Sequence, residues 1–282
     1  MTRHAVVCLM LFTSNFLFAS PQASGGNADL AIGIQAYKNA KYEEAAQHLE
    51  RAAANEPGNV QAHLYLANVY AQQYIPGRDE ESNPQQGNAG IREYRRVLEL
   101  DAKNMEAVKG LGQMYFQMKE LDQAAEVYHG ALGMDAKDAE LYYSIAVIDW
   151  TRTYQPRMEQ RAKLKLRQEQ PLIFAAECST VREANWERVA DGMEMLKKAI
   201  DLRHEYDDAM AYMNLMYRER ADVQCNDPRA RAADLKAADD WVDMTLAIKN
   251  RKAASQQRSK TKSGSTSSLS GETENSTAPN PR

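Results

Sequence analysis

The sequence is short of positive charge, and this limits the ligands that suit it. Its 282 residues include 35 Lys and Arg against 39 Asp and Glu, which gives a formal net charge of −4. Because no chain-wide basic field can replace phosphate counterions, we predict that the protein is not a general nucleic-acid binder. The local exception is a basic stretch formed by Arg152, Arg157, Arg161, Lys163, Lys165 and Arg167. Glu159 and Glu169 interrupt this stretch, so we predict the solvated face of a helix, with binding to an acidic protein or an anionic surface as the alternative.

Motifs of catalysis and of metal binding are also missing. The chain has no Gly-rich phosphate loop, no nucleophile elbow and no His-Glu-x-x-His pattern. Its histidines share no common spacing, and the densest polar cluster, which begins at His204, is typical of a turn with capping carboxylates. We therefore expect a protein that is not an enzyme and that binds no metal and no cofactor.

Long apolar runs are absent after the first twenty residues. At the start of the chain, Arg3 and His4 precede an apolar run that is interrupted once and ends in small residues between Ala19 and Ser24. This order predicts a secretory signal over residues 1–24, since the run is too short for a stable membrane anchor. Cys8 lies inside the run and not at its end, which argues against a lipid-modified cysteine. We expect a mature chain without a transmembrane span, exported to the periplasm or associated with the envelope.

A repeated pattern is the most informative feature that the sequence does contain. Two blocks of about 34 residues, 26–59 and 105–138, carry it. The first contains Ile32-Gly33, Tyr37, Tyr42-Glu-Glu-Ala45, Leu49, Ala52 and Pro57, and the second contains Leu111-Gly112, Tyr115, Leu121-Asp-Gln-Ala124, Tyr128 and Ala131. Small residues such as Gly33 and Ala45 let two helices cross closely, while the larger residues fill the gaps between turns. The pattern resembles the tetratricopeptide repeat (TPR), in which each unit is a pair of amphipathic helices, A and B.

The resemblance implies an all-α fold, a right-handed α-solenoid of about five helix pairs. The units fall at about 26–59, 60–104, 105–138, 139–206 and 207–252, so the solenoid covers residues 25–252. Extra residues separate helix A from helix B in the second, fourth and fifth units, at about 75–85, 154–187 and 222–232. Insertions of this kind map to loops on one rim of a solenoid. Within the longest insertion, the composition from Pro156 to Arg167 predicts an added short helix.

The composition changes near Ala253, where apolar residues become rare and Ser and Thr become frequent. Such a segment cannot bury enough surface to offset the entropy lost on ordering. Residues 253–282 are therefore predicted to form a disordered tail.

The resemblance also implies a concave groove lined by the A helices. Members of the TPR family mostly hold peptides and partner proteins. Carried over to this chain, the groove positions are Tyr37, Lys38, Asn68, Gln72, Lys109, Gln113, Phe116, Tyr143, Val147, Trp150, Leu215, Arg218 and Glu219. Aromatic rings give contact area at low entropy cost, and amides bond to a peptide backbone. The alternative for Phe116, Tyr143 and Trp150 is that each ring packs against the next helix. The carboxylate-clamp pattern of some relatives is not matched, because Leu64, Glu106 and Gly110 stand at its positions.

Cysteine is scarce, and the three that occur allow one pairing within the mature chain. Removal of Cys8 with the signal leaves Cys178 and Cys225, both in the predicted A–B insertions of consecutive units. Because such insertions emerge from the same rim, we predict a disulfide between them in an oxidising compartment. The alternative is two unrelated buried thiols.

These features together predict a non-enzymatic scaffold or adaptor that binds a protein or peptide partner in the bacterial envelope. The chain resembles uncharacterised exported TPR proteins of Gram-negative bacteria. Two alternatives remain, a component of an outer-membrane assembly or secretion machine and a periplasmic chaperone-like holder of unfolded chains.

Overall fold

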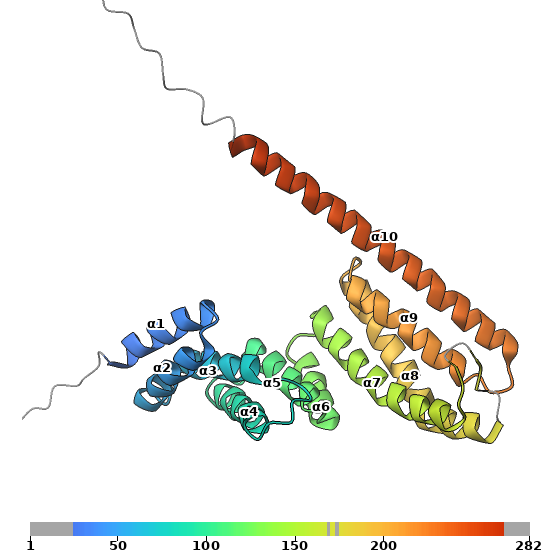
Figure 1. Ribbon diagram of the computed structural model, residues 1–282, viewed down its shortest axis with the longest axis horizontal. Coiled ribbons are helices and arrows are strands. Elements are labelled where there is room, and N and C mark those ends of the chain that lie inside the picture. Colours follow the sequence, from blue (N-terminus) through green and yellow to red (C-terminus); the bar gives the residue numbers. More distant parts are fainter. Residues whose placement is uncertain (1–24, 168–169, 173–174, 268–282) are drawn as a thin grey trace, which may run out of the picture.

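The structure, a computed structural model, describes residues 25–167, 170–172 and 175–267 of the chain. The predicted signal segment, Glu169 and the last part of the predicted tail, residues 268–282, lie outside this range. Every regular element among the described residues is a helix (Figure 1). In chain order the helices are α1 Gly25–Lys38, α2 Tyr42–Asn55, α3 Val60–Gln73, α4 Ser82–Leu100, α5 Met105–Gln117, α6 Leu121–Leu132, α7 Ala139–Lys163, α8 Ala175–Leu202, α9 Asp207–Asp222 and α10 Pro228–Ser267. In the described part of the chain, none of them combines the length and the apolar character that a bilayer span requires.

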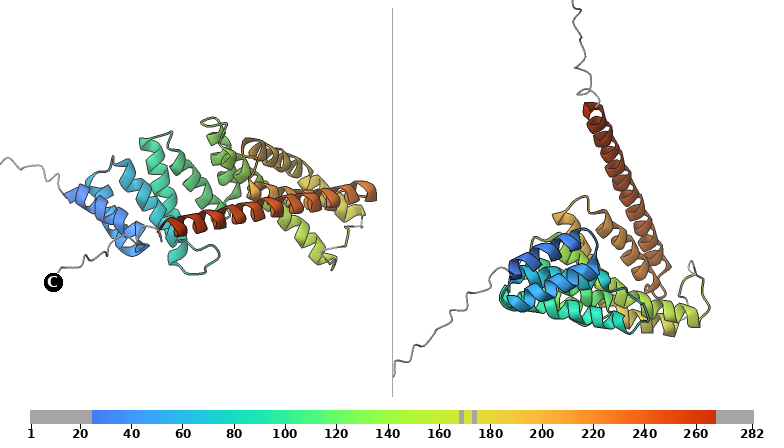
Figure 2. Two further views of the ribbon diagram at one scale, coloured as in Figure 1. Left: turned by 90° about the horizontal axis from the view of Figure 1, so that it is seen from above. Right: turned by 60° about the vertical axis from the view of Figure 1, so that its left-hand side comes forward.

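The helices stack as successive hairpins along one axis, so the all-α solenoid predicted from the sequence is confirmed (Figures 1 and 2). Each odd-numbered helix packs against the next helix in the chain, and α1 also contacts α3, α3 contacts α5, and α7 contacts α9. The odd-numbered helices are therefore the A helices, which line one continuous face. Asn59, Asn104 and Asp138 cap three of them, since each side chain accepts a backbone N–H from the first turn of α3, α5 or α7.

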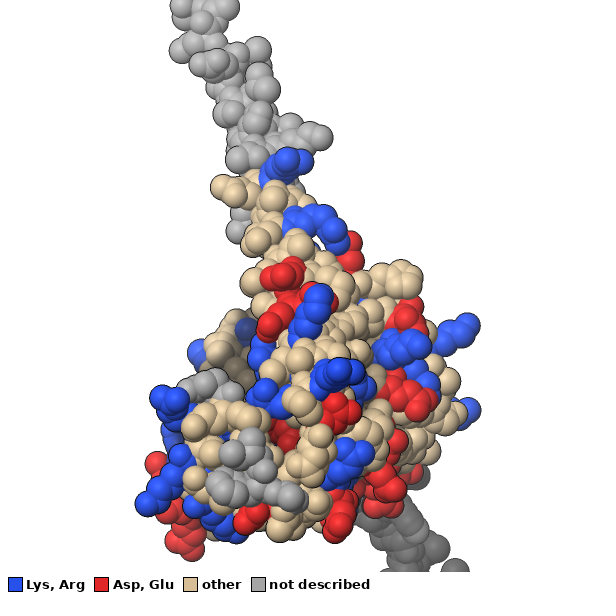
Figure 3. Space-filling view, turned by 90° about the vertical axis from the view of Figure 1, so that its right-hand side faces the viewer, with Lys and Arg blue, Asp and Glu red and all other residues tan. Residues whose placement is uncertain are grey.

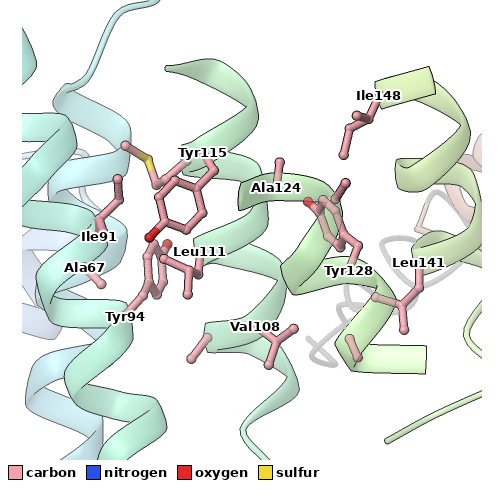
Figure 4. Packing of buried hydrophobic residues seen from close by; sticks show 14 of the residues in the cluster. Ala67, Ile91, Tyr94, Val108, Leu111, Tyr115, Ala124, Tyr128, Leu141 and Ile148 are labelled. Carbon is pink, nitrogen blue, oxygen red and sulfur yellow. The ribbon is translucent and has the colours of Figure 1, made fainter. Parts of the chain in front are cut away.

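Close packing in the middle of the solenoid depends on small residues opposite tyrosines (Figure 4). A Cβ placed on Gly112 in α5 would come within 2.6 Å of Cζ of Tyr128 in α6. Gly110 meets the ring of Tyr94 in α4 in the same way, at 2.3 Å. Both tyrosines are almost fully buried. Glycine at these two positions is therefore what allows a bulky ring to fill the gap between neighbouring helices.

This packing predicts the sign of a glycine substitution. We expect Gly112→Ala to lower the free energy of unfolding by about 1–2 kcal/mol, because overpacking costs more than the gain of about 1 kcal/mol in helix propensity. Gly130→Ala in α6 is the matched control, since its added Cβ meets nothing within 4 Å. The control should gain up to about 1 kcal/mol. Urea denaturation followed by circular dichroism measures both, and a stabilised Gly112→Ala would contradict the packing argument.

The fourth hairpin differs from its prediction, because longer helices take up much of the expected insertion. α7 continues through Pro156 to Lys163, and α8 begins at Ala175; the described residues between them contain no separate short helix. A proline inside a helix deprives the preceding turn of a hydrogen-bond donor. Pro156 therefore leaves the carbonyl of Arg152 without its usual backbone donor, and beside it Asn185 of α8 donates its Nδ2 to the carbonyl of Thr153 at 2.9 Å, which ties α8 to this turn of α7.

The basic stretch at the end of α7 is only partly solvated, so that prediction is wrong for two of its members. Lys163, Lys165 and Arg167 are exposed, but Arg157 and Arg161 are 9% and 2% exposed. These two guanidiniums lie against carboxylates of α9. On the end of the molecule seen in Figure 3, Lys and Arg side chains are interspersed with Asp and Glu. That face presents no broad surface of one charge sign.

A disulfide joins Cys178 and Cys225, the two cysteines paired by the sequence analysis, with their Cα atoms 5.7 Å apart. Cys178 lies in the first turns of α8, whereas a loop position was expected, and Cys225 lies in the turn between α9 and α10. The bridge sits in a small apolar cluster that includes Leu172, Val181 and Val223. It attaches the α9–α10 turn to the start of α8.

The last helix overturns part of the tail prediction, because α10 continues to Ser267 and residues 253–267 are helical. Its middle is held to the α8–α9 turn, where Lys252 donates to Asp207 and Arg251 donates to Glu205. Beyond these contacts residues 253–258 are exposed. The C-terminal part of α10 projects away from the other helices (Figures 1 and 2).

Candidate functional site

Two hollows lie along the face formed by the A helices. The first, of about 360 Å³, is shared by α3, α5 and α7, and it contains four of the predicted groove residues. Its lining is Asn68, Glu106, Lys109, Gly110, Gln113, Tyr128, Glu140, Tyr143 and Ser144. Residues from three separate A helices therefore converge here, as the groove prediction requires.

Hydrogen bonds fix the polar side chains on one wall of this hollow. The Tyr94 hydroxyl donates to Oδ1 of Asn68 at 2.6 Å, and Nδ2 of Asn68 donates to Oε1 of Glu106 at 3.0 Å. Burial raises the pKa of Tyr94 above its ordinary value, so its hydroxyl stays a donor. The amide of Asn68 is held in one orientation. Gln113 is exposed, and its side chain makes no hydrogen bond to the described residues, which leaves it available to a ligand.

The opposite wall carries an ion-pair cluster around Lys109. Its Nζ lies 2.6 Å from Oδ2 of Asp138 and 2.6 Å from Oε2 of Glu140. Burial would lower the pKa of Lys109, but hydrogen bonds to the two carboxylates outweigh it and raise that pKa. The pKa of Asp138 is lowered in turn, since the Lys109 bond and the Glu140 backbone N–H overcome its burial. The wall therefore carries one more negative than positive charge, with Lys109 shared between the two carboxylates.

The second hollow, of about 510 Å³, lies between α7, α9 and the start of α10. It contains the predicted groove residues Trp150, Leu215, Arg218 and Glu219. Sequence reasoning missed the other lining residues, which are Tyr154, Arg157, Asp222, Arg231 and Leu235. The spacing of Tyr154, four residues after Trp150, would have placed it on the same helix face if α7 had been expected to continue.

The aromatic groove residues both line the hollows and pack against the next helix. The ring of Tyr143 lies 5.1 Å from that of Tyr206 and 5.5 Å from that of Tyr212 in α9. The Trp150 ring lies 5.4 Å from Tyr212 and 4.8 Å from Tyr154, measured between ring centroids. Tyr143 and Trp150 therefore pack against the next helix, which is the alternative that the sequence analysis considered for them. Replacing either one would disturb the α7–α9 contact as well as the groove.

The remaining predicted positions do not join either hollow. Tyr37 packs edge-on against Tyr65 at 5.6 Å, and Lys38 is exposed at the end of α1. Gln72 is exposed on α3, Phe116 packs against the central core, and Val147 is buried. The A helices thus bring together the middle and last groove positions, whereas the first ones lie apart from these hollows.

A buried carboxylate, Asp149, lies next to the aromatic residues on α7. It is 9% exposed, and Nη1 of Arg152 lies 3.8 Å from its Oδ1. Burial raises its pKa to about 6, with Asp191 adding to the shift and Arg152 and Arg188 opposing it. An unfolded Asp titrates at about 3.9, so the folded protein holds this proton more tightly than the unfolded chain.

The raised pKa predicts a stability gain for Asp149→Asn that depends on pH. The contribution of Asp149 to stability is most favourable below pH 4, is lost as the pH rises from about 4 to 6, and stays unfavourable above that range. At pH 7.5 we expect the variant to gain on the order of 2 kcal/mol, and near pH 4 we expect no difference. Asp243→Asn, at an exposed position of α10, should change stability by less than about 0.5 kcal/mol at either pH. Denaturation curves at the two pH values test this, and a variant that gains equally at both would contradict it.

The fold and the two hollows define a class of protein, the helical-repeat solenoids that bind along an inner face. A family model described as "Tetratricopeptide repeat" matches residues 30–82 and 85–139, which extend from α1 to the start of α7. Residues 30–82 and 85–139 are therefore tetratricopeptide repeats, and the helix pairs that follow continue the same stack. Repeats of this kind build protein-interaction scaffolds, so the fold implies a protein partner.

Solved structures show the same fold over most of the chain. A structure described as MamA protein matches with a TM-score of 0.54 and 15% sequence identity, and the match covers 82% of this chain and 94% of that one. A MamA structure from Desulfovibrio magneticus RS-1 matches with a TM-score of 0.54 at 15% identity, covering 81% of this chain and 97% of that one. At such identities the likeness concerns the fold alone. No curated protein sequence matches the chain.

Proposed function

We propose that this protein is an exported, non-enzymatic scaffold that holds an extended segment of a partner protein against the A-helix face. The observation that carries the proposal is the first hollow, in which α3, α5 and α7 place exposed Gln113 beside oriented Asn68. Amide side chains of this kind donate to and accept from a peptide backbone. The half-buried ring of Tyr143 adds apolar contact area beside them.

Export to the periplasm or envelope is the second part of this proposal. Two features support it, the basic and apolar order of the first residues and the disulfide between Cys178 and Cys225. Disulfides persist in oxidising compartments and are rare in a reducing cytosol. The mass of the intact protein from its native host tests export. A chain that retains Met1 in the cytosolic fraction would contradict it.

Site-specific photo-crosslinking in the native host tests the proposed groove. A photoreactive amino acid replaces Gln113 in the groove of one variant and Gln123 of α6 in the control, both of which are exposed. We expect a discrete crosslinked partner from position 113 and none from position 123. Crosslinks from position 123 alone would move the binding surface to the B helices. A smear of many products from position 113 would instead favour the chaperone-like alternative.

A further inference from the structure

The second hollow has a different chemistry from the first, because aromatic and aliphatic side chains form a large part of its lining. The rings of Trp150 and Tyr154 lie 4.8 Å apart with 33° between their planes. Leu215 of α9 and Leu235 of α10 complete the apolar lining. Tyr154 is 39% exposed, so part of this surface faces solvent. A volume of about 510 Å³ accommodates a large apolar side chain together with its backbone.

The ion pairs around this hollow leave a lining cation, Arg218, with a solvent-exposed partner. Its two lining carboxylates, Glu219 and Asp222, are both bound by Arg157 at distances of 2.7–2.8 Å. Arg218 donates through Nε to Asn214 and through Nη2 to Asp239, but its Nη1 makes no hydrogen bond to the described residues. The side chain of Asp239 is 70% exposed, so this pair is solvated and weak. Arg218 is therefore a charged group that is available to a ligand carboxylate.

The two hollows are close enough for one short segment to reach both. Tyr143 lines the first and Trp150 the second, and they lie seven residues apart on α7. At 1.5 Å per residue this is about 10 Å along the helix axis. An extended peptide covers that distance with about three residues.

We propose that the second hollow selects which segment the groove binds. It takes an apolar side chain of an extended peptide against Trp150 and Tyr154, while an adjacent Asp or Glu side chain pairs with Arg218. The inference rests on the proposed function, because it names the kind of segment that the same groove holds. The carboxylate is assigned to a side chain within the segment, and a peptide with a free terminal carboxylate tests this assignment.

Binding of defined peptides to the full-length protein tests this. The probe is the fluorescein-labelled peptide Gly-Ser-Phe-Glu-Ser-Gly amide, compared by fluorescence anisotropy with analogues in which Gln replaces Glu or Ser replaces Phe. On the wild-type protein we expect the Glu peptide to bind about tenfold more tightly than the Gln analogue, which is typical of a charged hydrogen bond. The Ser analogue should lose at least about tenfold.

Variants separate the role of Arg218 from a general effect of charge. Arg218→Met should reduce the preference for Glu over Gln to about one, because it weakens binding of the Glu peptide more than binding of the Gln analogue. Arg229→Met, at an exposed position of α10 outside the hollow, should keep the full preference. Circular dichroism spectra of the variants confirm that both remain folded.

Several results would overturn the inference. Equal affinities for the Glu and Gln peptides on the wild-type protein would do so, as would failure of all the peptides to bind. A peptide that ends in a free carboxylate after Phe, bound more tightly than the Glu peptide, would assign the site to chain termini instead. A specific crosslink from position 113 without any peptide preference would leave the proposed scaffold function standing and remove only this selection. If the wild-type protein prefers the Glu peptide but position 113 gives no crosslinked partner, the result would contradict the proposed scaffold function.

Discussion

Arg157→Met is expected to lower the free energy of unfolding by about 3–5 kcal/mol, because it leaves a buried carboxylate without its ion-pair partner. Glu219 is 1% exposed, and its two oxygens accept from Nε and Nη2 of Arg157 at 2.7 and 2.8 Å. Asp222 keeps a second guanidinium, Arg161, at 2.9 Å, whereas Glu219 has no such replacement among its hydrogen bonds. The substitution therefore weakens the contact between α7 and α9. Urea denaturation followed by circular dichroism measures it.

The pH dependence of this variant gives a sharper test than its stability at one pH. Burial raises the pKa of Glu219, and the Arg157 guanidinium opposes that rise. Without the guanidinium the folded protein should hold the Glu219 proton still more tightly. The stability penalty should therefore shrink as the pH falls, since the protonated carboxyl carries no charge to bury. A penalty that stays constant between neutral and acidic pH would contradict the ion-pair explanation.

Two further variants control for the size of the effect. The double variant Arg157→Met, Glu219→Leu removes both charges and should recover most of the lost stability. Lys236→Ala breaks the exposed ion pair with Asp240 and should cost less than about 1 kcal/mol. If the exposed and buried pairs cost the same, burial is not the cause.

Removal of the disulfide is expected to have the second large effect, a loss of up to about 4 kcal/mol in the chain-entropy model. The bridge joins cysteines 47 residues apart, and that segment contains most of α8 and all of α9. The double variant Cys178→Ala, Cys225→Ala should unfold at lower urea concentration. Amide exchange should accelerate most at the start of α8 and in the α9–α10 turn, where the bridge holds the two segments together.

Reductant provides the control for this prediction. It should destabilise the wild-type protein and leave the double alanine variant unchanged. If the untreated wild-type and double variant have equal stability and equal exchange rates, the bridge makes no contribution to the folded state.

The repeat pattern predicted much of the fold because its signal depends on contacts between neighbouring segments. Gly112 and Tyr128 are sixteen positions apart, and the close crossing of α5 and α6 needs their combination of sizes. The same local logic predicted the helix pairs. It also placed Asn68, Lys109, Gln113 and Tyr143 on one face, and they share the first hollow.

The fourth and fifth hairpins were harder to predict because their partners are distant in the chain. Arg157 and Arg161 have the composition of a solvated helix, and only the folded chain brings Glu219 and Asp222 to them from about sixty residues away. Pro156 suggested the start of a new helix, but α7 continues through it, and Asn185 of α8 bonds to the Thr153 carbonyl in the same turn. Neither contact leaves a periodic trace in the sequence. The second hollow, which depends on the length of α7, was therefore only half predicted.

The disulfide has a mechanical consequence for a chain that is pulled from its two ends. Tension would pass from α8 to the α9–α10 turn through the sulfur bridge, so the residues between Cys178 and Cys225 would bear no load. The hairpins from α1 to α6 lack such a shortcut and are held by contacts with their neighbours. Under force they should unfold first. The disulfide prevents the segment between the two cysteines from extending, and that segment would add about 160 Å of length if it were released. The cross-linked end would then remain folded as an anchor after the rest of the solenoid has stretched.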